Sequence, residues 1–322
     1  MEENQDITSK LIDPKHNNQD IFITGNFPGI SKPKERRCCF CKCYVFPKQY
    51  AFCGHWQIKP FMPMFVLSLV LSSYAVILCA SLRSVTRSEF VVGVVILGIL
   101  LSFFIYSYIM VIYVGPGYFP FYWSYVKNGG VVENETAVSG VVSTDAQYQW
   151  TLLQDRPPRS KFFRTAHRYV LQPDHFCGWV GSWIGKLNVK FFTLFNLYGS
   201  IYLMVYITWG IRIIVKMAME KKFFISFYII ILFVSASFYF IFMTSFFCFN
   251  TIRNSLMNIT RIEKWNKIPI DAFTKNDWRL NLSDFYGDDS LCCYLCPSKP
   301  FGNKTNDELA EGFPGYDEIE ML

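Results

Sequence analysis

The sequence predicts an all-α integral membrane protein that crosses the bilayer with four transmembrane helices. Its 322 residues are 52% hydrophobic and 18% aromatic, and only 17% are charged, which is less than a soluble globular protein usually carries. The apolar residues gather in four charge-free runs, each long enough to cross a bilayer core. Paired by short polar turns, these runs are not typical of buried helices in a soluble fold. The runs are 61–82, 90–114, 191–211 and 223–249.

An even number of spans places both termini and the long segment between spans two and three on one side of the membrane. Lys and Arg near the spans, among them Lys59, Lys186 and Lys264, favour this side as the cytosolic one. The polar first 60 residues lack the apolar region of a cleavable signal peptide. The predicted parts are an N-terminal tail with a Cys-rich juxtamembrane end (1–60), helices one and two (61–114), a cytosolic domain (115–190), helices three and four (191–249) and a cytosolic C-terminal region (250–322).

The segments outside the spans differ in composition, and each composition predicts a structure. Residues 1–34 are polar with scattered Pro, Gly and Asn, which predicts a disordered tail. The sequence GPGYFP at 115–120 predicts a turn after the second span. Residues 149–190 are rich in aromatic and basic side chains and predict a compact element. After the fourth span, 250–267 predict a juxtamembrane helix and 278–287 a small aromatic element.

The stretch DHFC at 174–177 brings together the residue types of a thiol nucleophile, its base and a group that orients the base. A free thiol is mostly protonated at neutral pH, so an adjacent imidazole makes it a better nucleophile. A carboxylate beside the imidazole stabilises its protonated form. Asp174, His175 and Cys177 are therefore the candidate catalytic residues.

Four motifs, in order around the four spans, resemble those of the DHHC protein S-acyltransferases. The sequence PPRSKFFRTAHRYVLQPDHFCGWVG at 157–181 follows the family's cysteine-rich domain without gaps. GPGYFP resembles the Asp-Pro-Gly element, with Gly115 in place of Asp. NITRIE at 258–263 resembles the Thr-Thr-x-Glu motif, and NLSDFYG at 281–287 the C-terminal Asn-plus-aromatic motif. The resemblance implies a cytosolic catalytic domain between the second and third membrane helices.

The resemblance also implies roles for single residues. Cys177 would take a long-chain acyl group from an acyl-CoA such as palmitoyl-CoA, His175 would move the proton, and Asp174 would orient His175. An apolar slot between the spans would hold the acyl chain, with Gly199, Ser200, Ser235 and Ser237 as candidate gaps. The candidate acyl-CoA-binding residues are Trp179 and the cations Arg156, Arg159, Lys161, Arg164 and Arg168, although such cations also occur on ordinary basic juxtamembrane surfaces.

The chain departs from the family at the eight positions that bind two zinc ions. One set of four positions holds Gln149, Leu152, Phe162 and Tyr169, and the other holds Phe163, Ala166, Phe176 and Trp183. None of these is a competent zinc ligand in this setting, so we expect no zinc at the usual family sites. Because most replacements are large and apolar, we expect an apolar core in place of the metals. Arg261 stands where the family has a Thr that supports the Asp, and it could pair with Asp174.

Two cysteine clusters lie outside this domain, and three interpretations of them stay open. Cys39, Cys41 and Cys43 near the N-terminus and Cys293 and Cys296 near the C-terminus could bind a metal. They could also be juxtamembrane sites of S-acylation, or simple thiols at the membrane surface.

The sequence thus favours a protein S-palmitoyltransferase that acylates cysteines of cytosolic or membrane proteins near the bilayer. The alternatives are a catalytically inactive DHHC-like scaffold or partner subunit, and an unrelated four-span channel or adaptor. The net charge of +6 suits a surface against anionic lipid and is too dispersed to predict nucleic-acid binding. We expect a multi-pass protein of endomembranes (ER or Golgi) or the plasma membrane, with its active site and both termini in the cytosol.

Overall fold

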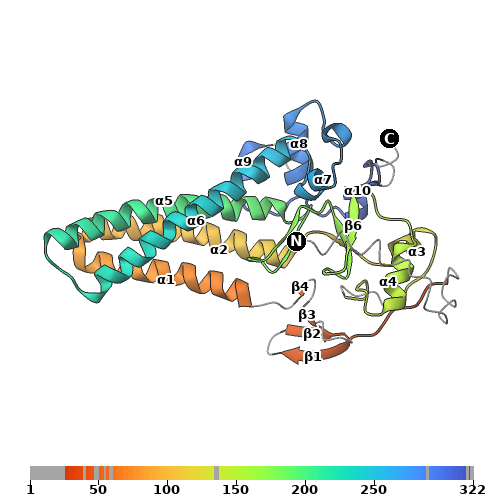
Figure 1. The fold of residues 1–322 in the computed structure, drawn as a ribbon, viewed down its shortest axis with the longest axis horizontal. Coiled ribbons are helices and arrows are strands. Elements are labelled where there is room, and N and C mark those ends of the chain that lie inside the picture. Colours follow the sequence, from red (N-terminus) through yellow and green to blue (C-terminus); the bar gives the residue numbers. More distant parts are fainter. Residues whose placement is uncertain are drawn as a thin grey trace, which may run out of the picture.

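A long helical bundle with a smaller mixed domain at one end makes up this computed structural model (Figure 1). The four bundle helices are long and apolar enough to cross a membrane, which confirms the predicted spans and fold class. The structure describes residues 26–38, 41–46, 51–53, 56–57, 61–133, 138–287, 290–316 and 319. The bundle helices are α1 (Phe61–Ser84), α2 (Arg87–Val114), α5 (Val189–Met219) and α6 (Ile225–Leu256).

Helix α5 extends beyond its predicted run and carries charged residues at its far end. Arg212 there forms an ion pair with Glu89 in the first turn of α2. Thr86 caps α2 in a capping box with Glu89, which explains why the helix begins directly after the short loop. The charges at this loop therefore tie two helix ends together outside the apolar part of the bundle.

Close packing of the bundle helices depends on small residues and a few polar contacts between apolar faces. An added Cβ at Gly93 would meet the ring of Trp209 at 2.7 Å, and one at Gly210 would meet Val234 at 2.5 Å. The hydroxyl of Ser200 donates to Thr244 over 2.9 Å, which joins α5 to α6.

The segment between α2 and α5, which we call the extramembrane domain (residues 115–188), contains short strands as well as helices. This is an addition to the predicted all-α fold. The aromatic-rich stretch is too short between its turns for helices and pairs instead as antiparallel strands in the order β5-β7-β6 and β8-β9. The elements are β5 (Tyr118–Phe119), α3 (Trp123–Lys127), α4 (Asp145–Leu152), β6 (Ser160–Phe163), β7 (Arg168–Leu171), β8 (His175–Cys177) and β9 (Ser182–Ile184).

The C-terminal region folds back against the extramembrane domain (Figure 1). The predicted juxtamembrane helix is interrupted: α6 ends at Leu256, and Asn258 has a positive φ of 48° that starts a new direction. The predicted aromatic element is the helix α8. The elements are α7 (Arg261–Trp265), the 3-10 turn η1 (Ile270–Ala272), α8 (Trp278–Tyr286), α9 (Leu291–Leu295) and α10 (Asn306–Ala310).

The described part of the N-terminal region is ordered, whereas the sequence predicted a disordered tail over 1–34. Residues 1–25 lie outside the described residues, but Phe27 stacks on Tyr125 with ring centroids 4.3 Å apart. Gln147 donates to the carbonyl of Gly29 over 2.9 Å. An aromatic anchor thus outweighs the polar composition around it. A four-stranded antiparallel sheet follows, with strands β1 (Lys34–Cys38), β2 (Cys41–Val45), β3 (Ala51–Cys53) and β4 (Trp56–Gln57).

Candidate active site

The hairpin of β8 and β9 places two of the three predicted catalytic residues on one side of a strand. His175 pairs with Ile184, Phe176 with Trp183, and Cys177 with Ser182. Side chains alternate along a strand, so His175 and Cys177 share a face while Phe176 belongs to the other. Phe176 therefore lies between His175 and Cys177 in the sequence, but it belongs to the opposite face of the strand and does not come between their side chains.

Asp174, His175 and Cys177, the candidate catalytic residues, lie close together in the structure. The carboxylate oxygen Oδ2 of Asp174 lies 2.7 Å from Nδ1 of His175. This bond leaves Nε2 of the imidazole for the thiol of Cys177, which is also a hydrogen-bond partner of His175. Cys177 is only 6% exposed, and the ring of Phe192 lies edge-on to the imidazole at 5.0 Å. The arrangement is that of a thiol, a base and an orienting carboxylate.

The surroundings of the carboxylate and the imidazole favour the charged form of both. Burial opposes ionisation of Asp174, but the His175 hydrogen bond and the charges of His175 and Arg261 outweigh it, so the pKa lies below its usual value. Burial likewise opposes protonation of His175, but its hydrogen bonds to Asp174 and Cys177 prevail and raise the pKa of the imidazole. His175 is therefore a stronger base than free imidazole.

Asn188 and Gly185 fix the position of the catalytic hairpin at the end of α5. The Asn188 side chain accepts from the backbone N–H of Gly185 over 2.9 Å and donates to the carbonyls of Val111 and Trp183, both at 3.0 Å. A Cβ at Gly185 would meet the carbonyl oxygen of Leu171 at 2.7 Å, so only glycine fits. These contacts join the hairpin to α2, β7 and α5 at one point.

A fully buried ion pair connects the extramembrane domain to the C-terminal region. Arg159 donates through Nε to Glu263 over 2.8 Å and through the other arms of its guanidinium to the side chain and carbonyl of Asn258, at 2.9 and 2.7 Å. The guanidinium also lies 3.9 Å from the ring centroid of Phe273. The motif at 157–181 and the motif at 258–263, about a hundred residues apart, are thus joined in one hydrogen-bond network.

The predicted acyl-CoA-binding cations do not form one cluster. The donors of Arg159 are used inside the protein, and Arg168 is buried, with its guanidinium 3.9 Å from the ring centroid of Tyr118. Burial lowers the pKa of Arg168 to about 10. Arg156 and Arg164 are exposed and Lys161 is half-buried, so a role in binding phosphate stays a prediction for these three.

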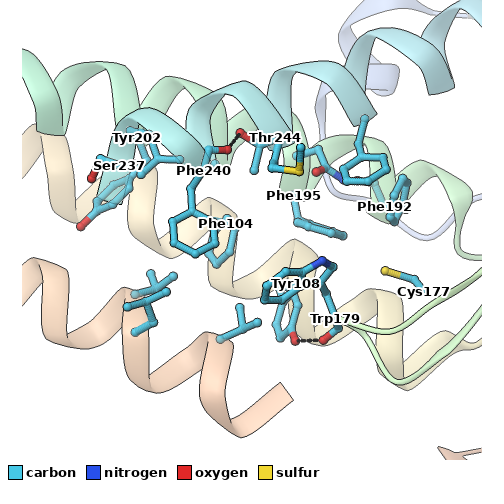
Figure 2. A pocket seen from close by; sticks show the side chains of 18 of the residues that line it. Phe104, Tyr108, Cys177, Trp179, Phe192, Phe195, Tyr202, Ser237, Phe240 and Thr244 are labelled. Atoms are coloured by element: carbon cyan, nitrogen blue, oxygen red, sulfur yellow. Dashed lines mark hydrogen bonds between the residues drawn. The ribbon is translucent and has the colours of Figure 1, made fainter. Parts of the chain in front are cut away.

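An apolar cavity of about 240 Å³ runs from Cys177 into the helical bundle. Figure 2 shows Cys177 at one end, Tyr202 and Ser237 at the other, and aromatic rings between them. A hydrogen bond of 2.9 Å between Ser73 and Tyr202 joins two residues of its far wall. The predicted residues Trp179, Gly199 and Ser237 line the cavity, while Ser200 instead bonds to the lining residue Thr244 and Ser235 is not among the lining residues.

The residues at the family's zinc positions do not fit a zinc ion. One set of positions, which we call the inner corner, consists of Phe163, Ala166, Phe176 and Trp183. There the ring centroid of Trp183 lies 3.9 Å from that of Phe163, on which it stacks, and 5.8 Å from that of Phe176.

The other set, which we call the outer corner, consists of Gln149, Leu152, Phe162 and Tyr169. There the ring centroids of Phe162 and Tyr169 lie 5.5 Å apart. Neither corner offers thiolate or imidazole ligands. Within the described residues, no three His, Cys, Asp or Glu side chains gather in a group that could hold a metal.

The expected apolar core at these positions is only partly formed. Ala166 and Trp183 of the inner corner and Tyr169 of the outer corner are buried. Leu152 is 41% exposed and Phe176 is 39% exposed, and Gln149 is exposed. Leu152 ends the short helix α4 and is largely exposed, so the sequence overestimated how much apolar surface replaces the metals.

The roles of two residues at the site were not predicted from the sequence, because they depend on partners far along the chain. Tyr108 of α2 donates to the carbonyl of Trp179 over 2.7 Å. Lys186 is buried and donates to the carbonyl of Asp284, and burial lowers its pKa to about 7. No local pattern marked either residue. The predicted partner Arg261, in contrast, does lie against Asp174, at 3.3 Å between Nε and Oδ2.

Four membrane-spanning helices with an Asp-His-x-Cys hairpin at one end define a multi-pass membrane protein with a thiol-based site. The profile of the DHHC palmitoyltransferases matches residues 142–268. This match and those to three curated relatives confirm the resemblance to the DHHC family.

The curated relatives match about a third or less of this chain. The chain is 30% identical over 100 residues to Probable protein S-acyltransferase 12 of Arabidopsis thaliana, covering 31% of this chain and 34% of the relative. It is 32% identical over 105 residues to Probable protein S-acyltransferase 13 of the same plant, covering 31% and 35%. It is 31% identical over 87 residues to Palmitoyltransferase AKR1 of Yarrowia lipolytica, covering 26% and 12%. The chain thus spans about a third or less of the length of these relatives.

Proposed function

We propose that this protein is a protein S-acyltransferase that moves a long-chain acyl group, such as palmitoyl, from acyl-CoA through Cys177 to cysteines of other proteins. The observation that carries the proposal is the apolar cavity that opens at the Cys177 thiol beside His175. A hydrocarbon chain suits such a lining, and a thioester carbonyl at its head would then lie next to the nucleophile. The names of the relatives support the same reaction class.

The first step forms an acyl-enzyme. The Cys177 sulfur attacks the thioester carbonyl of acyl-CoA, and Nε2 of His175 accepts the thiol proton. The carbon–sulfur bond to CoA breaks, and the CoA thiolate leaves and takes up the proton from the imidazolium. Asp174 stabilises the imidazolium while it exists, because its carboxylate lies 2.7 Å from Nδ1.

The second step reverses these roles with a different thiol. An acceptor cysteine loses its proton to His175 and attacks the Cys177 thioester, and the Cys177 thiolate leaves and regains the proton. One thioester replaces another, so the transfer needs no additional energy source. The acceptors would be membrane or cytosolic proteins with a cysteine near the bilayer. The site and both termini face the cytosol in this proposal, on an endomembrane or the plasma membrane.

A catalytically inactive scaffold or partner subunit is the second candidate function. The observation that favours it is that neither corner of the extramembrane domain has zinc ligands, so the hairpin depends on other contacts to hold its geometry. The hydrogen bond of 2.7 Å between Asp174 and His175 and the buried contacts of Asn188 favour the enzyme.

Labelling with radioactive palmitoyl-CoA separates the two candidates. Purified full-length protein should take up label that hydroxylamine releases, and Cys177→Ala should lose nearly all of it. Cys296→Ala is the matched control, because Cys296 is an exposed thiol elsewhere on the molecule. Equal labelling of wild type and Cys177→Ala would reject Cys177 as the acyl carrier and leave the scaffold.

A further inference from the structure

The first residue of α7 touches the carboxylate of Asp174 twice. The backbone N–H of Arg261 donates to Oδ1 over 2.9 Å, and the side-chain Nε lies 3.3 Å from Oδ2. The same Oδ2 accepts the hydrogen bond from His175 at 2.7 Å. One carboxylate oxygen is therefore shared between a permanent cation and the catalytic imidazole.

The guanidinium is held at the active site by aromatic rings of two bundle helices. Its central carbon lies 5.3 Å from the ring centroid of Phe247 and 5.9 Å from that of Phe192. Its NH2 donates to Thr251 over 3.3 Å. Phe192 is also the ring that lies edge-on to His175 at 5.0 Å. Arg261 and His175 thus lie near one ring as well as one carboxylate.

Other charged and titratable groups act on this pair less directly. Lys264 of α7 interacts with Asp174 through its charge, but its Nζ is hydrogen-bonded to Asn254 at 2.6 Å. Arg253 of α6 acts on Lys264, and Tyr286 of α8 faces Asp174 with its hydroxyl bonded to Ser255. The thiol of Cys177 lies on the other side of the imidazole. Of these described groups, Arg261 is the cation in direct contact with the carboxylate.

We propose that Arg261 is a positioning residue that shares the Asp174 carboxylate with His175 and so limits how strongly the imidazole holds its proton. The proposal rests on the acyltransferase function proposed above. Without the guanidinium, the whole charge of Asp174 would act on His175, and the imidazolium would be stabilised further. His175 would then stay protonated to higher pH, so that at a given pH less of it would be in the neutral form that accepts the thiol proton.

Substitutions of Arg261 test the effect of its side-chain charge alone, because every residue except proline keeps the hydrogen bond from the backbone N–H to Oδ1 of Asp174. Arg261→Met removes the charge and keeps apolar length, while Arg261→Lys keeps the charge. Lys264→Met is the matched control, since it removes a cation from the same helix that does not contact Asp174. Thermal unfolding of each purified full-length variant establishes that it is folded.

The first readout is the single-turnover rate of Cys177 acylation by palmitoyl-CoA as a function of pH. In Arg261→Met we expect the acidic limb of the profile to move up by about 0.5–1 pH unit, the effect of one partly screened charge at several Å. Arg261→Lys and Lys264→Met should move it less. A uniform loss of rate in Arg261→Met with no displacement of the limb would assign Arg261 a purely structural role and overturn the proposal.

The second readout does not need acyl transfer. A small methylthiolating reagent modifies Cys177 in the absence of acyl-CoA, and mass spectrometry of the Cys177 peptide gives the rate at each pH. The same displacement of the profile in Arg261→Met is expected here. If wild type shows no Cys177-dependent acylation yet the reactivity profile moves, the proposed function fails while the role of Arg261 stands. An unmoved reactivity profile contradicts that role directly.

Discussion

The inner and outer corners of the extramembrane domain hold together in different ways, although the family places a zinc ion at each. The inner corner is filled from within by neighbouring strands: Phe163 stacks on Trp183 at 3.9 Å, and Ala166 is buried beside them. In the outer corner, Tyr169 is buried, but Gln149 and Leu152 remain exposed.

The outer corner is instead covered by the C-terminal region. Leu309 and Ala310 of α10 pack in one cluster with Tyr169 and Phe119. Trp123 donates to Asp307 over 2.7 Å, which fixes α10 against α3. A small domain without metal ligands can therefore gain buried apolar surface either from its own hairpins or from a distant part of the chain.

The largest expected effect comes from breaking the inner corner. Trp183→Ala removes the ring that contacts both Phe163 and Phe176 and the N–H that donates to Thr165 over 3.1 Å. We expect a loss of about 3–5 kcal/mol in the stability of the domain, as for other buried aromatic truncations. Hydrogen exchange followed by mass spectrometry should show faster exchange throughout β6, β7, β8 and β9.

Trp183→Phe is the matched control for this prediction, because it keeps an aromatic ring in the stack and removes only the N–H. Its exchange rates should lie close to those of wild type. If Trp183→Ala exchanged as slowly as wild type, the inner corner would not depend on the aromatic stack.

The second largest effect comes from uncovering the outer corner. Leu309 is 7% exposed, and its truncation in Leu309→Ala should cost about 2–3 kcal/mol, at the lower end for buried leucine because α10 is short and can relax. We expect a lower melting temperature in detergent and earlier proteolytic cleavage after α9. Leu295→Ala, at a position that is 56% exposed, is the control and should melt as wild type does.

The spans could be predicted from the sequence because their physical cause is local. A charge-free run longer than a bilayer core defines a span by itself, whereas the shared face of His175 and Cys177 depends on a strand that the sequence did not predict. The role of Arg159 could not be predicted in this way. Its charge is satisfied by Glu263, far along the chain, and only the folded network makes its burial favourable.

The outer corner shows the same limit of local reasoning. Leu152 and Tyr169 are both apolar replacements at positions of one zinc site, and the sequence treats them alike. In the fold, Tyr169 is 1% exposed because α10 covers it, whereas Leu152 at the end of α4 is 41% exposed. Helix α10, more than 130 residues further along the chain, therefore decides which of the two apolar side chains is buried.

Truncation of Leu152 itself should have the smallest effect on stability. Because the side chain is largely exposed, Leu152→Ala should change the free energy of unfolding by less than about 0.5 kcal/mol, and the better helix propensity of alanine offsets part of that. The melting temperature should stay within about 2 °C of wild type, in contrast to Leu309→Ala. A loss of 2 kcal/mol or more would mean that Leu152 closes over Tyr169, and that the outer corner, like the inner one, is filled from within.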